Sequence, residues 1–144
     1  FAGNIGEAQA LGTILEAARI VEIDYPNISF IFLGKGIECD ELIKKRNDLK
    51  LSNVHFLEMV SMLEATSYLQ AADILLLHLK SNPLFEITIP SKTQAYMSQG
   101  KPILMGLRGE AAELIRKSGG GVLFEPENSQ SLASAAIKCS FLKY

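Results

Sequence analysis

Short apolar runs alternate with amphipathic segments along the whole chain. Five runs are rich in Ile, Val, Leu and Phe, and several lack the polar alternation of a half-exposed strand, which is typical of strands buried on both faces of a sheet. They cover residues 28–33, 54–57, 74–79, 102–105 and 121–124. The opening FAG is interpreted as the end of a further strand that reaches a glycine turn.

Helical spacing of apolar residues predicts six helices between and after these strands. In the first of them, Leu11, Ile14 and Leu15 share one face. In the fourth, Pro90 stands in the first turn, where its missing N–H costs nothing. The predicted helices cover residues 10–21, 38–49, 61–71, 90–99, 110–117 and 129–141.

The strict alternation of strand and helix predicts the fold class. It favours an α/β domain with a Rossmann-like, doubly wound parallel sheet of about six strands and helices on both faces. Ligands of such sheets bind outside the carboxyl ends of the strands, beside helix N-termini that suit phosphate. The loops at that edge are GNIGEAQ, GKGIE, LEMVSM, KSNPLFEITIPSK, GLRGE and EPENS.

Composition narrows the class of protein. The 144 residues suffice for one domain, and the net charge of −2 leaves no basic excess for a nucleic-acid backbone. Cys39 and Cys139 match no metal spacing, so a reduced, cytoplasmic protein is the simplest interpretation. No apolar run approaches the roughly 18 residues of a membrane span. Because the chain lacks an initiator Met, we expect it to be a piece of a longer protein.

Two glycine-containing loops are candidates for ligand binding. Gly34 and Gly36 follow a strand and open a helix, but Cys39 stands where a dinucleotide fingerprint has its third glycine. Gly3 and Gly6 would let phosphates approach the backbone. A tight turn without a ligand explains either pair equally well.

Other features favour a structural interpretation. The SGGGVLF stretch at 118–124 precedes a strand, so we interpret it as a helix stop and turn. His78 ends a strand and His55 lies inside one, and neither has a metal-ligand or catalytic partner at suitable spacing. We therefore expect both to be hydrogen-bonded structural histidines.

The stretch EITIPSKTQAYMSQGKPIL, residues 86–104, combines three kinds of chemistry at one helix start. Glu86, Ser91 and Lys92 supply an acid, a hydroxyl and a cation within the longest loop at the ligand edge. A purely structural alternative is that Ser91 caps the helix while Glu86 favours its dipole.

The order of these segments resembles a known family. FAGNIGEAQALGTILEAARI, FIFLGKGIECDEL, LQAADILLLHLK, PLFEITIPSKTQAYMSQGKPIL and GGGVLFEPENSQSLASAA are similar to the C-terminal, donor-binding half of the family four (group 1) retaining glycosyltransferases, which have the GT-B fold. The similarity runs over nearly the whole chain. It is closest to the branch that adds amino-sugars in bacterial O-antigen and capsule assembly, where PSK…Y…GKPI is usual.

The resemblance implies that residues 1–144 form a nucleotide-sugar binding domain and that an N-terminal acceptor domain is absent. The implied enzyme moves a sugar from a nucleotide diphosphate-sugar to a glycan or lipid-linked acceptor with retention. No cofactor and no essential metal are expected, since no Asp-x-Asp occurs. We expect cytoplasmic residence. The resemblance implies that any contact of the full-length protein with the inner membrane face is made through the missing half.

The resemblance also assigns roles to single residues. The first acid of the family's E-x7-E pair matches Glu86, which would contact the donor sugar, while the second position holds Gln94, which would contact the ribose. The family's R-x4-K pair falls on Asn4 and Gln9, so both charges are missing. Lys92 is then the expected cation for the diphosphate leaving group. The remaining expected donor-binding residues are Gly3, Asn4, Gly6, Gly34, Gly36 and Ser91.

The missing second Glu and the missing Arg/Lys pair leave a second function open. A non-catalytic ligand-binding or regulatory domain of the same fold would also lack the second Glu and the Arg/Lys pair, and fold alone does not separate it from an enzyme.

Overall fold

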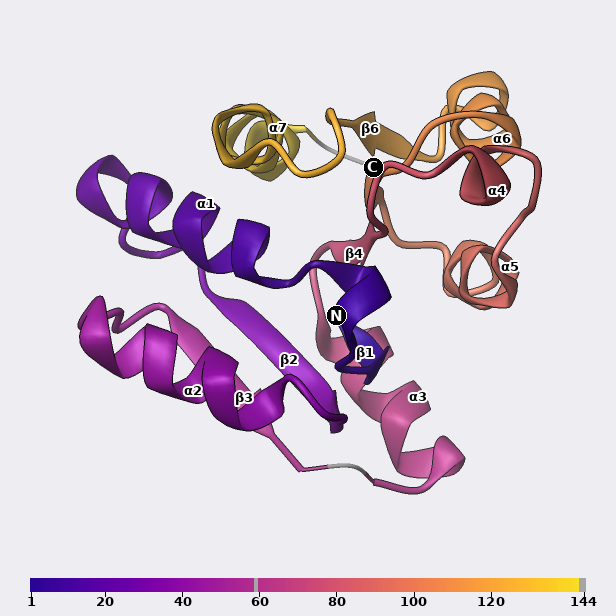
Figure 1. Cartoon of the computed structure of the whole chain (residues 1–144). Helices are drawn as coiled ribbons and strands as arrows, with labels where there is room; N and C mark the ends of the chain where they lie inside the picture. Colours follow the sequence, from indigo (N-terminus) through magenta and orange to yellow (C-terminus); the bar gives the residue numbers. More distant parts are fainter. Residues whose placement is uncertain (59, 143–144) are drawn as a thin grey trace.

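The computed structural model describes residues 1–58 and 60–142, so Met59 of the predicted 57–62 loop lies outside it. The elements follow the chain in the predicted alternation (Figure 1). They are β1 (Ala2–Asn4), η1 (Glu7–Gln9), α1 (Gly12–Asp24), β2 (Phe30–Lys35), α2 (Cys39–Asp48), β3 (Val54–Leu57), α3 (Met62–Ala71), β4 (Leu75–His78), α4 (Pro83–Glu86), α5 (Ser91–Met97), β5 (Ile103–Gly106), α6 (Glu110–Ser118), β6 (Gly121–Leu123) and α7 (Ser129–Phe141).

All six predicted strands and six predicted helices are present, with ends shifted by a few residues. Two short elements were missed, the 3-10 turn η1 and the one-turn helix α4. The start of helix α4 has the residues typical of a helix N-terminus. The Asn82 side chain accepts a hydrogen bond from the backbone N–H of Leu84 at 2.9 Å, and Pro83 occupies the first turn. No helix in the described part of the chain is long and apolar enough to cross a membrane.

The strands form two three-stranded parallel sheets, in the orders β1-β2-β3 and β4-β5-β6. This confirms the α/β fold class and the parallel pairing. It corrects the expectation of one continuous sheet, because no backbone ladder joins β1 to β4 within residues 1–58 and 60–142. Hydrogen bonds from His78, the last residue of β4, to Gln9 and from Lys80 to Ala8 bring the ends of these two edge strands together. We call the boundary between β1 and β4 the seam.

A tyrosine side chain replaces the missing backbone partner at the seam. The Tyr96 hydroxyl, which comes from α5, accepts a hydrogen bond from the N–H of Ala2 at 3.1 Å and donates one to the carbonyl oxygen of Ala2 at 3.4 Å. Only 2% of Tyr96 is exposed, and this burial raises the pKa of its phenol to about 12. The hydroxyl therefore stays protonated and pairs both backbone groups of the β1 edge.

Around the sheet β4-β5-β6 the core has one apolar layer on each face. Alternate residues of β4 divide between them: Leu76 packs with α1 and α7, whereas Leu75 and Leu77 pack with α5 and α6. Strand β5 divides in the same way. Because both faces are buried, apolar residues follow one another without polar interruption, as the sequence pattern predicted. Figure 1 shows α7 next to α1, which it contacts closely.

Strands β1 and β2 approach each other more closely than side chains would allow. A Cβ atom at Gly34 would collide with the carbonyl oxygen of Gly3, and one at Gly36 would collide with that of Ile5. These two glycines therefore have a packing role that fixes the β1–α1 turn against β2. The expected contact of Gly34 and Gly36 with a ligand stays a prediction.

Removing the Tyr96 hydroxyl is expected to weaken the seam. Tyr96→Phe keeps the buried ring but leaves the N–H and C=O of Ala2 without partners, which should lower the free energy of unfolding by about 1–3 kcal/mol. Urea unfolding monitored by circular dichroism measures the change. Tyr68→Phe is the matched control, because Tyr68 on α3 is 46% exposed, and it should change stability by less than about 0.5 kcal/mol. Equal stability of the two variants would contradict the role given to Tyr96.

Candidate functional site

The seam is where a ligand is expected to bind. In open parallel sheets the crevice for ligands lies at the carboxyl ends of the strands where the strand order reverses, and β1 and β4 are the strands on either side of that point. Three segments meet there: the β1–α1 turn, the segment 79–90 between β4 and α5, and the start of α5. The residues singled out in the sequence lie mostly on these segments.

Lys92 extends from the first turn of α5 over the end of β1. Its Nζ atom lies 4.0 Å from the centroid of the Phe1 ring, and a Cβ atom at Gly3 would collide with this ammonium group. Burial without an acidic partner lowers the pKa of Lys92 to about 8. Gly3 thus makes room for a cation that has lost much of its hydration, which is a favourable starting point for an anionic ligand.

The β1–α1 turn is closed by neutral side chains. The Gln9 side-chain oxygen accepts a hydrogen bond from the N–H of Gly6 at 3.1 Å. A Cβ atom at Gly6 would lie 2.6 Å from Nδ2 of Asn4 and 3.0 Å from that oxygen of Gln9. Asn4 and Gln9, on which the expected Arg/Lys pair falls, therefore lie together over Gly6. They give this turn its shape without giving it charge.

Glu86 is the last residue of α4 and lies against a different loop. A Cβ atom at Gly109 would collide with the backbone carbonyl of Glu86, so the end of α4 packs directly on the β5–α6 turn. The neighbouring guanidinium is that of Arg108, which pairs with Glu125 and donates to the Ser81 hydroxyl at 3.1 Å. The Glu125 carboxylate raises the pKa of Arg108, with a smaller contribution from Glu86. Glu86 thus lies against the β5–α6 turn, whereas Lys92 lies over β1.

Ser91 and Gln94 are exposed on α5. The structural alternative for Ser91 is wrong, because Pro90 occupies the N-cap position and no side chain caps this helix. Ser91 is instead the first helical residue. Nothing in the structure tests its expected contact with the diphosphate, or that of Gln94 with the ribose.

His78 is a buried structural histidine, as expected. Its Nδ1 lies 2.8 Å from the carbonyl oxygen of Gln9, and its Nε2 lies 2.9 Å from the N–H of Glu127. Its ring stacks on Phe124 with the centroids 5.6 Å apart. Burial lowers the pKa of the imidazole. His55, by contrast, is exposed on β3.

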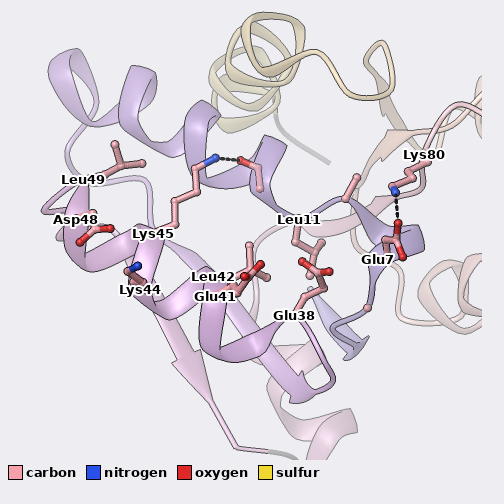
Figure 2. A pocket seen from close by; sticks show the side chains of 13 residues that line it. Glu7, Leu11, Glu38, Glu41, Leu42, Lys44, Lys45, Asp48, Leu49 and Lys80 are labelled. Atoms are coloured by element: carbon pink, nitrogen blue, oxygen red, sulfur yellow. Dashed lines mark hydrogen bonds and ion pairs between the residues drawn. The ribbon is translucent and has the colours of Figure 1, made fainter.

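A cavity of about 500 Å³ opens on the other side of the β1–α1 turn, against α2 (Figure 2). Four carboxylates and three ammonium groups line it: Glu7, Glu38, Glu41, Asp48, Lys44, Lys45 and Lys80. Lys80 is held by Glu7, and Lys45 by Glu16 and the carbonyl oxygen of Gly12. A diphosphate entering this cavity would meet an excess of negative charge, so the seam beside Gly3 and Lys92 is the better anion site.

A family comparison agrees with this geometry. The sequence pattern of the family described as "Glycosyl transferases group 1" matches residues 1–140. The chain belongs to this family. No curated protein matches the chain significantly.

Solved structures share the fold of this group 1 domain. HepE of Anabaena in complex with UDP is 22% identical, with a TM-score of 0.76 over 96% of this chain and 38% of HepE. TarM of S. aureus is 15% identical, with a TM-score of 0.81 over 96% of this chain and 27% of TarM. The C-terminal domain of LpcC from Francisella tularensis is 21% identical, with a TM-score of 0.74 over 93% of this chain and 69% of that domain. The chain thus spans well under half the length of HepE or TarM.

Several residues of the group 1 domain that shape the site were not among the sequence candidates. Tyr96 holds the β1 edge, and Glu127 and Lys80 link the turns around His78. For Glu127 the sequence offered little signal, because its role depends on a partner 49 positions away. Tyr96 carried a clearer signal, since a tyrosine in a short helix beside the ligand edge has a hydroxyl that must find a partner once buried.

Proposed function

We propose that this group 1 domain binds the diphosphate of a nucleotide-sugar donor at the seam. In the whole protein it would serve a retaining transfer of a hexosyl or N-acetylhexosaminyl group to a glycan or lipid-linked acceptor, in bacterial surface polysaccharide synthesis. One observation carries the proposal: the ammonium group of Lys92 is seated over Gly3, the middle residue of β1, next to the β1–α1 turn. Support comes from the similarity to HepE, which has been solved with UDP and with UDP-glucose.

Lys92 would stabilise the leaving group. When the bond from the sugar to the diphosphate breaks, negative charge grows on the phosphate oxygens, and a preorganised cation in a poorly hydrated site lowers the energy of that state. With Asn4 and Gln9 neutral, Lys92 replaces the charge pair that the β1–α1 turn lacks. A bound diphosphate would also raise the pKa of Lys92, because an anion beside it favours the ammonium form.

Glu86 would hold the sugar. An ionised carboxylate only accepts hydrogen bonds, so it is suited to two neighbouring sugar hydroxyls. The backbone of Glu86 packs on Gly109, which fixes the end of α4 that presents this carboxylate. Gln94 would contact the ribose as a neutral partner. We propose that no metal is required, because the sequence lacks Asp-x-Asp and a lysine would supply the compensating charge.

A non-catalytic ligand-binding or regulatory domain of the same fold is the second candidate. It is favoured by the β1–α1 turn, in which the Gln9 side chain already occupies the N–H of Gly6. Titration with UDP, GDP and ADP tests the two candidates first. Saturable binding of one nucleotide supports the donor-binding domain, and no binding of any at millimolar concentration contradicts it.

Lys92→Ala should weaken the binding of UDP. A charge-assisted contact to phosphate contributes about 1.5–3 kcal/mol, so the dissociation constant should rise roughly 10- to 150-fold. Because the pKa of free Lys92 is about 8, the wild-type chain should also lose affinity as the pH rises from 7 to 9, while the variant should not. Isothermal titration calorimetry at both pH values measures this, and the variant controls for titration of UDP itself.

Two further cations serve as controls for Lys92. Lys35→Ala and Arg108→Ala change exposed residues on neighbouring turns, and each should leave UDP affinity within about twofold of wild type. Unchanged affinity in Lys92→Ala together with a large loss in one of these variants would transfer the role to that residue and overturn the assignment.

Glu86→Gln should weaken the binding of the sugar without weakening the binding of the nucleotide. The amide offers one acceptor oxygen instead of a charged pair, so affinity for UDP-glucose should fall by about tenfold while affinity for UDP stays the same. Calorimetry with both ligands gives the comparison. Glu41→Gln, an exposed acid that lines the cavity of Figure 2, should affect neither ligand. Equal losses for UDP and UDP-glucose in Glu86→Gln would indicate that Glu86 has only a structural role.

A further inference from the structure

The hydrogen bonds of His78 determine its protonation. The backbone N–H of Glu127 can only donate, so Nε2 must carry no hydrogen. The carbonyl oxygen of Gln9 can only accept, so Nδ1 must carry one. The ring is therefore the neutral Nδ1–H tautomer, and both of its nitrogens are used. A second proton on Nε2 would face the N–H of Glu127 and break that contact.

The contacts of His78 continue into the segment that carries Glu86. Glu127 has a left-handed backbone, with φ of 56°, which is unfavourable for a residue with a side chain. In this conformation its N–H reaches His78 while its carboxylate accepts a hydrogen bond from the N–H of Ser81 at 2.9 Å. The neighbouring Lys80 donates its N–H to the carbonyl oxygen of Ala8 at 2.9 Å. The start of segment 79–90 is thus tied to both the β6–α7 turn and the β1–α1 turn.

These contacts cross the seam where no strand ladder does. Tyr96 joins the two halves at Ala2, and His78 joins them at Gln9, beyond the end of β1. A buried side chain that satisfies two backbone groups from two other segments allows those segments few alternative arrangements. The β1–α1 turn and segment 79–90 are the segments that flank Lys92 and lead to Glu86.

We propose that His78 is a positioning residue, which fixes the β1–α1 turn and segment 79–90 relative to each other and so preorganises the seam for a nucleoside diphosphate. It does not touch the ligand. The last step, in which the fixed segments favour binding of a nucleoside diphosphate, rests on the proposed function. The positioning itself can be measured without any ligand.

Two variants and a control test the role of His78. His78→Leu keeps an apolar side chain against Phe124 but leaves the N–H of Glu127 and the carbonyl of Gln9 without partners. His78→Gln restores an acceptor for the N–H of Glu127. His55→Leu is the matched control, because His55 is exposed on β3. Thermal melts first establish the temperature at which all three variants are folded.

The first measurement uses nuclear magnetic resonance without ligand. Long-range ¹⁵N spectra of the wild type at pH 7.5 should show a protonated Nδ1 and an unprotonated Nε2 for His78. The amide resonances of Lys80, Ser81 and Glu127 should move in His78→Leu, return towards wild type in His78→Gln, and stay in place in His55→Leu. An Nε2–H tautomer, or unmoved amide resonances in folded His78→Leu, would overturn the inference.

The second measurement is the dissociation constant of UDP for the same proteins. We expect it to rise about tenfold in His78→Leu, to recover most of that loss in His78→Gln, and to be unchanged in His55→Leu. If the wild type binds UDP and folded His78→Leu binds it equally well, His78 serves stability alone and the inference fails. If the wild type does not bind UDP, the proposed function fails, whereas the amide resonances still decide whether His78 positions the two segments.

Discussion

Side-chain hydrogen bonds across the seam are the constraint on which the rest of this structure depends. Two parallel sheets meet at β1 and β4 without a backbone ladder, and buried polar groups left unpaired at such a boundary would cost several kcal/mol. Tyr96 supplies the missing partners at Ala2, and His78 supplies one at Gln9.

The charges around the seam follow from burial. A lysine lies over Gly3, and desolvation lowers its pKa to about 8. It is available to an anion because no acidic side chain within residues 1–58 and 60–142 pairs with it. Two of the three lysines of the neighbouring cavity are different, since Lys45 and Lys80 are already paired with carboxylates. The cavity against α2 is therefore the poorer site for a diphosphate. Coulombic attraction in a poorly hydrated site decides between the two, and it favours the seam.

The sequence was sufficient for the fold because local pattern and global arrangement agree. Uninterrupted apolar runs predicted strands buried on both faces, and Leu75, Leu76 and Leu77 divide between the two core layers as that pattern requires. The break between β1 and β4 could not be predicted, since it depends on where the Tyr96 hydroxyl reaches in three dimensions. The one-turn helix α4 was missed because four residues are too few to show helical periodicity.

The sequence could indicate some residues of the candidate site, but not how they contact one another. The sequence named Lys92 and Gly3 as separate candidates, and the structure adds that the ammonium group of Lys92 lies over Gly3. Their contact with a ligand stays a prediction. Gly34 and Gly36 looked like a phosphate loop, but the structure shows their close approach to β1, which no single sequence reveals. The roles of His78 and Glu127 emerged only from the structure, because each depends on backbone groups far away along the chain.

Mapping UDP onto the chain by chemical-shift perturbation tests the central claim most directly. In ¹H–¹⁵N spectra recorded during a titration of the 144-residue chain with UDP, the largest changes should fall on the amides of Gly3, Gly6 and Lys92, on the two sides of the seam. Changes confined to α2 around Glu41 and Lys44 would place the nucleotide in the neighbouring cavity and contradict the account. The absence of any change at millimolar UDP would contradict it as well.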